Sequence, residues 1–257
     1  MASMNEKIIS RAQRVPSAGR KFITKGSTPV ISFGDFTRAR VLTIGINPSS
    51  NEFFTSGKNR GLIPSKKGKR LEDFESLGIR TYEEIDDFAA KRIWQGCQNY
   101  FSESRNPYLS WFGHFQPVFS QIGASYIDGS AAHIDLVQWA TNPAWSALTA
   151  RVQRDLLVED LDFFQWQNSR PNVEVRLMNG STVLNQAKKL GIFSLREDAT
   201  LTIKDVNRRY TTRTFIGEGR SGELVLAWSQ NIQAMRASNK VKARLAEAIG
   251  DWAAKKI

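Results

Sequence analysis

The chain has 257 residues, 41% of them hydrophobic and 24% charged, which is typical of a globular protein and excludes a disordered or fibrous chain. Its 36 Lys and Arg residues exceed its 25 Asp and Glu residues and give a formal net charge of +11, which favours a polyanionic partner such as nucleic acid. One cysteine, Cys97, excludes an internal disulfide, and two histidines are too few for a histidine-rich metal centre.

The first 25 residues carry six basic residues and one acidic residue but lack the apolar stretch of a secretory signal. We expect a basic, partly mobile arm over residues 1–25, with an organellar transit peptide as the alternative, followed by a single α/β domain over residues 26–257. No run of about 18 apolar residues occurs, so no membrane-spanning segment is expected. The single cysteine fits a reducing compartment, and we expect a cytoplasmic protein, associated with the nucleoid if the source is bacterial.

Four short segments rich in Val, Ile and Leu predict largely buried strands. They are residues 41–46, 133–138, 173–178 and 224–228. Helical patterns separate them, which predicts a mainly parallel central sheet of four strands covered by helices on both faces. Residues 201–219, rich in Thr, Ile, Tyr and Phe, predict a β-hairpin inserted before the last of these strands.

Five segments show the apolar periodicity of amphipathic helices: residues 81–101, 112–123, 148–166, 181–191 and 238–257. Thr81 and Glu84 have capping-box spacing at the start of the first. Pro117 restricts the second to a start near that residue. Ser181 is a candidate cap for the fourth, and Gly191 a candidate stop.

The loop after the first strand, GINPSSNEFF at residues 45–54, contains the residues of a candidate site. In parallel sheets ligands bind beyond the carboxyl ends of the strands, where this loop lies. Gly45 permits close backbone approach, Asn47 supplies an amide that donates and accepts, and Pro48 stiffens the turn. An ordinary Asn-Pro turn is the alternative. The two phenylalanines and the basic run 58–70 that follow favour a site.

This loop resembles the first motif of the uracil-DNA glycosylase superfamily, in its Gly-Ile-Asn-Pro and Gly-Met-Asn-Pro branches. HIDLVQWATNPAW, at residues 133–145, resembles the second strand of that family and the loop after it. DLDFFQWQNSRPNVEVRLMNG, at residues 160–180, resembles the passage of leucine-rich helix, basic or proline turn, strand and glycine. The resemblance covers about residue 38 to the end and implies a three-layer α/β sandwich around a mainly parallel four-stranded sheet.

The resemblance implies a monofunctional DNA glycosylase that hydrolyses the N-glycosidic bond of uracil, or of a related deaminated base, after flipping it from the duplex. Asn47 would orient the attacking water, because an amide cannot take its proton as a carboxylate can. The residues implied to surround the substrate are Gly45, Ile46, Pro48 and Ser49. Phe53 or Phe54 would stack on the flipped base, and core packing is the alternative for both.

The second strand departs from the family pattern, because Asp135 stands where most members have a base-reading asparagine. A carboxylate accepts a hydrogen bond from the N3–H of uracil but donates one to O4 only when it is protonated. Asn142 is a candidate substitute for the reading role. Asp135 would then orient a neighbouring side chain or cap the following turn.

The last loop departs further, because LVLAWSQNIQAMRASNK, at residues 224–240, contains no His-Pro-Ser-Pro signature. Ser229, Gln230 and Asn231 are candidate neutral donors in place of that histidine, with Ser229 and Asn231 assigned a catalytic role. His114 or His133 reaching the site from elsewhere is the alternative. Three residues are candidates for the wedge that enters the duplex: Ile232, Met235 and Arg236.

Basic residues in three loop segments are expected to contact DNA phosphates. They are Lys58, Arg60, Lys66 and Lys67 after the first strand, Arg208 and Arg209 on the hairpin, and Arg236 and Lys240 near Met235. We expect a monomer that binds DNA containing uracil or another deaminated base, with no membrane partner, metal or organic cofactor. A non-catalytic protein that binds DNA or a modified base, and a nucleoside or nucleotide hydrolase, are the alternatives on a similar fold.

Overall fold

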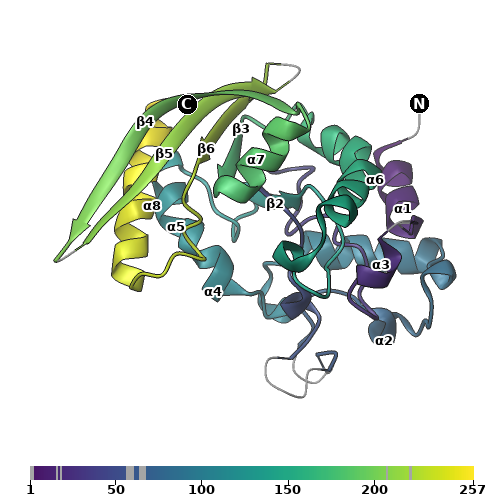
Figure 1. Cartoon of the computed structure of the whole chain (residues 1–257). Coiled ribbons are helices and arrows are strands. Elements are labelled where there is room, and N and C mark those ends of the chain that lie inside the picture. Colours follow the sequence, from purple (N-terminus) through teal and green to yellow (C-terminus); the bar gives the residue numbers. More distant parts are fainter. Residues whose placement is uncertain are drawn as a thin grey trace. The chain divides into compact units, whose positions relative to one another are not determined.

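Helices and strands alternate along most of the chain in the computed structural model (Figure 1), which describes residues 3–15, 17, 19–55, 61–63, 68–206, 208–219 and 222–257. The strands are β1 (Val41–Gly45), β2 (Ala131–Asp135), β3 (Val175–Asn179), β4 (Phe193–Asp205), β5 (Arg208–Gly219) and β6 (Leu224–Trp228). The α-helices are α1 (Met4–Gln13), α2 (Phe74–Leu77), α3 (Asp87–Gln98), α4 (Leu109–Phe112), α5 (Gln116–Ile122), α6 (Ala150–Asn168), α7 (Ser181–Lys189) and α8 (Asn239–Ala254).

The protein is α/β, with a mixed six-stranded sheet in the order β2-β1-β3-β6-β5-β4. Strands β1, β3 and β6 are parallel, with Val41 opposite Val175 and Val175 opposite Leu224. The four predicted strands are confirmed within a few residues. The predicted count of four strands was too low, because β5 of the hairpin pairs antiparallel with β6, and the hairpin thereby extends the sheet.

The described chain divides into two compact units, and the sheet lies in the second apart from His133–Asp135 at the end of β2. The first unit comprises Met1–Phe36, Ile46–Pro107 and His133–Gln167. The second comprises Thr37–Gly45, Tyr108–Ala132 and Asn168–Ile257.

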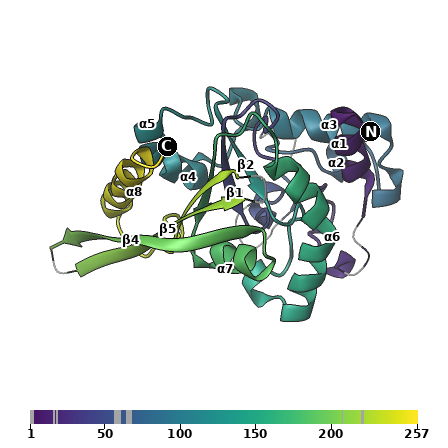
Figure 2. The ribbon, with the colours of Figure 1, turned by 90° about the horizontal axis from the view of Figure 1, so that it is seen from above.

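In the second unit, helices cover both faces of the sheet. Figure 2 shows α5 and α8 on one side of the strands β4 to β6 and α7 on the other. Residues of β3 and β6 are buried on both faces, as expected for central strands between helical layers. The apolar face predicted for the last helix is confirmed, since Val241, Leu245, Ile249 and Trp252 are all buried.

In the first unit, residues expected to lie in a basic N-terminal arm form helix α1. A capping box between Ser3 and Glu6 starts the helix, and Ile8 and Ala12 are fully buried. Arg11 is buried as well, and its Nη2 donates to Asp160 Oδ1 of α6 at 2.7 Å. This segment is therefore packed into the first unit, because its apolar face and one of its charges find partners there.

Two predicted helix starts were wrong, and one was right. Helix α3 begins at Asp87, because the Asp86 side chain accepts from the Ala89 N–H and caps it, whereas Thr81 precedes only a short 3₁₀ turn. Helix α7 is capped by Gly180 instead of Ser181, and the φ of +104° at Gly180 suits glycine. Pro117 lies in the first turn of α5, as predicted.

Candidate functional site

The polar loop after β1 is held against the loop after β2 within the first unit. The Ile46 carbonyl accepts from the Val137 N–H at 2.9 Å. A 3₁₀ turn, η2 (Ser50–Glu52), follows, and the Ser49 side chain accepts from the Asn51 N–H at its start. Pro48 is buried and Ser49 is exposed. The turn is therefore fixed by backbone contacts to a second segment, and the Asn47 side chain is placed with it.

The orientation of the Asn47 amide is set by three acceptors around one atom. Nδ2 donates to the Pro48 carbonyl at 3.1 Å, the Trp139 carbonyl at 3.2 Å and Thr141 Oγ1 at 3.2 Å. Oδ1 receives no hydrogen bond from the residues that the structure describes. Because only the NH₂ group can satisfy these acceptors, the carbonyl oxygen is the atom left to accept from a water molecule or a ligand.

The two adjacent phenylalanines of the loop occupy different environments. Phe53 is 1% exposed and belongs to the core, so the expectation that it stacks on a base is corrected. Phe54 is half-buried and forms a β-bridge with Leu62. Of the two rings, Phe54 is thus the one accessible to a ligand. The predicted DNA contacts in the basic run, Lys58, Arg60, Lys66 and Lys67, lie outside the described residues.

Asp135 ends β2 as a buried carboxylate beside a histidine. Its side chain is 4% exposed, and Oδ1 lies 3.3 Å from His133 Nε2. The His133 ring also packs on Phe33, with the ring centroids 5.5 Å apart. This geometry matches the alternative in which Asp135 orients a neighbouring side chain. Asn142, the candidate substitute, is exposed on the following loop, and its N–H donates to the Phe22 carbonyl.

Glu52 is the member of this region that sequence reasoning missed. It is 3% exposed, and Tyr100 donates from its hydroxyl to Oε2 at 2.6 Å. Burial raises the pKa of the Glu52 carboxyl to about 7; the Tyr100 hydrogen bond and the charge of Arg70 oppose this rise, and the charge of Asp135 adds to it. The only available signal was an ionisable residue placed directly before two aromatic residues, because helical or strand periodicity does not extend over this loop.

The predicted catalytic residues of the last loop lie in the second unit, where their side chains hold the loop together. Ser229 Oγ accepts from the Arg213 N–H at 3.0 Å. Asn231 Oδ1 accepts from the Ala234 N–H at 3.0 Å and lies 3.4 Å from Asn179 Nδ2. Asn179 Oδ1 in turn accepts from Trp228 Nε1 at 2.6 Å. These contacts give both predicted catalytic side chains a structural role in fixing the turn after β6.

The candidate wedge residues also differ in exposure. Ile232 is 1% exposed and Met235 is 8% exposed, so the expectation that either enters a duplex is corrected, because both pack inside the second unit. Arg236 and Lys240 are exposed, as are Arg208 and Arg209 on the hairpin. These four cations are thus available to a polyanion.

The remaining candidate, His114, lies in the second unit in the short 3₁₀ turn η6 (Gly113–Phe115). Burial lowers the pKa of its imidazole, and the charge of Lys242 acts in the same direction. Among the residues that the structure describes, no group of three His, Cys, Asp or Glu side chains is placed to hold a metal ion. No helix in the described part of the chain is long and apolar enough to cross a membrane.

Comparison of the chain with protein-family models gave no match, and comparison with curated proteins gave none.

Proposed function

We propose that the chain is a monofunctional DNA glycosylase that releases uracil or a related deaminated base, on a three-layer sandwich similar to that of the uracil-DNA glycosylase superfamily. The observation that carries the proposal is the Asn47 amide, whose Nδ2 is occupied by three acceptors and whose Oδ1 is left to bind water. The resemblance of GINPSSNEFF to the first motif of that family assigns this position to the water-orienting residue.

In the proposed reaction, the flipped nucleotide places its C1′ next to the water held by Asn47. The water oxygen bonds to C1′ as the C1′–N bond breaks, the bonding electrons leave with the base, and the water proton passes to solvent. Asn47 only orients the water, so stabilisation of the departing base anion provides most of the rate acceleration. Phe54 offers the stacking surface, and Asp135 orients the His133 side chain beside it in the strand.

The test is base release from a labelled oligonucleotide that carries one uracil, single- and double-stranded, read as alkali-sensitive cleavage. We expect Asn47→Ala to lose at least about 100-fold in rate with its DNA affinity retained, because the change removes the water acceptor and no phosphate contact. Asn185→Ala, the same change at an exposed position of α7, is the control. Unchanged base release by Asn47→Ala would refute the assignment of Asn47.

A non-catalytic protein of the same fold that binds DNA or a modified base is the second candidate. It is favoured by the last loop, where Ser229 Oγ and Asn231 Oδ1 accept hydrogen bonds from neighbouring backbone groups and the sequence has no histidine to donate to the leaving base. Salt-sensitive binding of the oligonucleotide with no release of uracil, hypoxanthine or xanthine would identify it. Activity on free nucleosides without DNA binding would instead identify a nucleoside hydrolase.

A further inference from the structure

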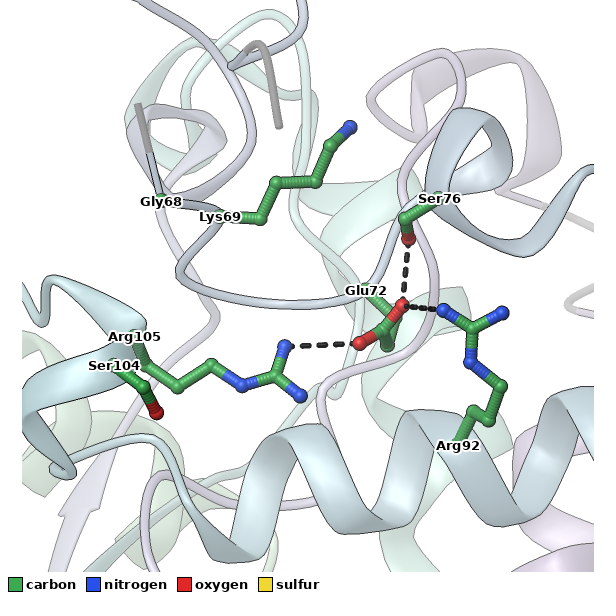
Figure 3. Close-up of a pocket in the computed structure, with 7 residues that line it drawn as sticks. All are labelled: Gly68, Lys69, Glu72, Ser76, Arg92, Ser104 and Arg105. Carbon is green, nitrogen blue, oxygen red and sulfur yellow. Dashed lines mark hydrogen bonds and ion pairs between the residues drawn. The ribbon is translucent and has the colours of Figure 1, made fainter. Parts of the chain in front are cut away.

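A polar cavity of about 390 Å³ lies within the first unit, where the segment leading into α2 meets α3 and the 3₁₀ turn η5 (Glu103–Arg105) (Figure 3). Its charged lining consists of three cations, Lys69, Arg92 and Arg105, and one carboxylate, Glu72. This volume lies within the usual range of ligand pockets. The lining is polar, so the cavity suits a charged ligand better than an apolar one.

Glu72 holds the two arginines in place. Its Oε1 accepts from Arg105 Nη1 at 2.9 Å, and its Oε2 accepts from Arg92 Nη2 at 2.9 Å and from Ser76 Oγ at 2.7 Å. Burial opposes ionisation, but the hydrogen bonds from Ser76 and Arg105 and the charges of both arginines outweigh it and lower the pKa of Glu72. The carboxylate therefore stays charged, and both of its oxygens are occupied.

Each arginine keeps further donors after it has bonded to Glu72. A guanidinium has five N–H groups in a planar fork, and each of these two side chains uses one nitrogen on Glu72. Neither side chain has another acceptor among the described residues, and their exposed fractions are 35% and 22%. Figure 3 shows the two guanidinium groups approaching Glu72 from opposite sides. Such partly buried, preoriented forks bind the oxygens of a phosphate group well.

The charge of the cavity is set by how its third cation is paired. Lys69 Nζ is bonded to the carboxylates of Asp73 and Glu75, so its charge is already compensated. Arg92 and Arg105 share the single carboxylate of Glu72 and leave a charge of about +1, which the second carboxylate on Lys69 offsets, so the whole cluster is close to neutral. A cluster without excess positive charge tolerates the one negative charge of a phosphodiester better than the two of a phosphate monoester.

We propose that the cavity between Arg92 and Arg105 binds one phosphodiester group of a nucleic-acid strand. Lys69, which lines the cavity, belongs in sequence to the basic run 58–70. Glu72 acts as a positioning residue, because it fixes both guanidinium groups and does not itself contact the ligand. The site requires a nucleic-acid strand but no base-release chemistry, so it can be tested apart from the proposed glycosylase.

The test measures binding of the full chain to an unmodified single-stranded oligonucleotide over a range of salt concentrations. We expect Arg92→Ala and Arg105→Ala each to weaken binding about tenfold at low salt and to reduce the slope of log K against log salt by about 0.7, because each removes one phosphate contact. Arg80→Ala, at an exposed position in the same unit, is the control and should leave the slope unchanged. Circular dichroism establishes that each variant is folded.

A second measurement uses the wild-type protein and does not depend on variants that fold. The Nε–H signals of Arg92 and Arg105 in NMR spectra should shift on addition of the oligonucleotide, and less on addition of inorganic phosphate or thymidine monophosphate at equal concentration. Equal shifts with the free phosphates would overturn the preference for a phosphodiester. Unshifted arginine signals, together with variants that melt earlier but bind as Arg80→Ala does, would show that the cluster only stabilises the fold. If the two arginine variants reduce the salt slope but the wild type releases no base, the proposed glycosylase is refuted and the phosphodiester site is supported.

Discussion

Asn47 and Glu52 lie in one short loop, and the surroundings of each side chain decide what it can do. Three acceptors around Nδ2 engage the donors of the Asn47 amide, so its carbonyl oxygen is the atom left to accept a hydrogen bond. Burial raises the pKa of Glu52 to about 7 although the hydrogen bond from Tyr100 opposes the rise, so this carboxyl group titrates near neutral pH. A residue's chemistry here follows from its neighbours more than from its type.

The raised pKa of Glu52 makes the stability of the fold depend on pH. Because the folded state binds this proton more tightly than the unfolded state, whose carboxyl pKa is near 4.5, the stabilisation is complete below pH 4.5. It is lost as the pH rises towards about 7. Glu52→Gln keeps an acceptor for Tyr100 and cannot ionise. Above about pH 7, we expect the free energy of unfolding of Glu52→Gln to be about 3 kcal/mol higher than that of the wild type. Below pH 4.5, we expect the two proteins to be equally stable.

Urea unfolding of both proteins at pH 4 and pH 8 measures this difference. Glu247→Gln, at an exposed position of α8, is the matched control, for which the difference from wild type should not change with pH. A Glu52→Gln protein whose stability follows that of the wild type at both pH values would show that Glu52 does not titrate in this range.

At the scale of elements, α1 is attached to the first unit through a buried charge as well as an apolar face. Arg11 Nε donates to Gln138 Oε1 at 2.9 Å, and Arg11 Nη2 pairs with Asp160 of α6. Asp160 Oδ2 also accepts from the Gln138 N–H, at 2.8 Å. The ion pair therefore connects three segments that are distant in sequence: α1, the loop after β2, and α6.

Removing Arg11 should be costly, because Asp160 would remain buried with its charge largely uncompensated. Arg14 also contacts Asp160, but its side chain is 46% exposed and compensates less. We expect Arg11→Ala to lower the free energy of unfolding by about 3–5 kcal/mol in urea titrations. Lys7→Ala, an exposed change on the same helix, should cost less than about 1 kcal/mol. A cost for Arg11→Ala no larger than that of Lys7→Ala would contradict a structural role for the pair.

At the scale of the whole molecule, the net charge of +11 sets the long-range interactions of the protein. We expect binding to single-stranded DNA to be governed by phosphate contacts, so affinity should fall about 50-fold between 50 and 200 mM salt if four phosphates are contacted. Fluorescence anisotropy of a labelled oligonucleotide measures this dependence. An uncharged peptide-nucleic-acid strand of the same bases is the control and should not bind. Affinity that is independent of salt would rule out a phosphate-dominated interface.

Much of the fold was predictable because it depends on local composition. The strand at residues 224–228 was predicted with the bounds observed for β6, because so short an apolar run between polar segments is long enough for a buried strand but not for a buried helix. The face of α8 was likewise predictable from its period. The sequence also located the Asn47 loop, because residues of that chemistry directly follow a buried strand.

The pairing of distant segments was not predictable. Local pattern identified the hairpin but not its pairing with β6, since an edge strand accepts a partner according to geometry and not sequence. Thr81 and Ser181 are both of residue types that cap helices, but Asp86 and Gly180 occupy the N-cap positions of α3 and α7. The N-terminal segment was expected to be an arm because its basic residues suggested exposure to solvent, whereas Arg11 is buried and pairs with Asp160 of α6.

By itself, the sequence determined the α/β alternation, the positions of the strands and the candidate role of the Asn47 loop, because each depends on residues close together in the chain. The tertiary structure decided which atom of Asn47 is left to accept a hydrogen bond, why Glu52 holds its proton near neutral pH, and that Phe53 and Met235 are core residues. It also brought Arg92 and Arg105 together on Glu72. These properties depend on burial and on partners distant in sequence, and only the folded chain sets both.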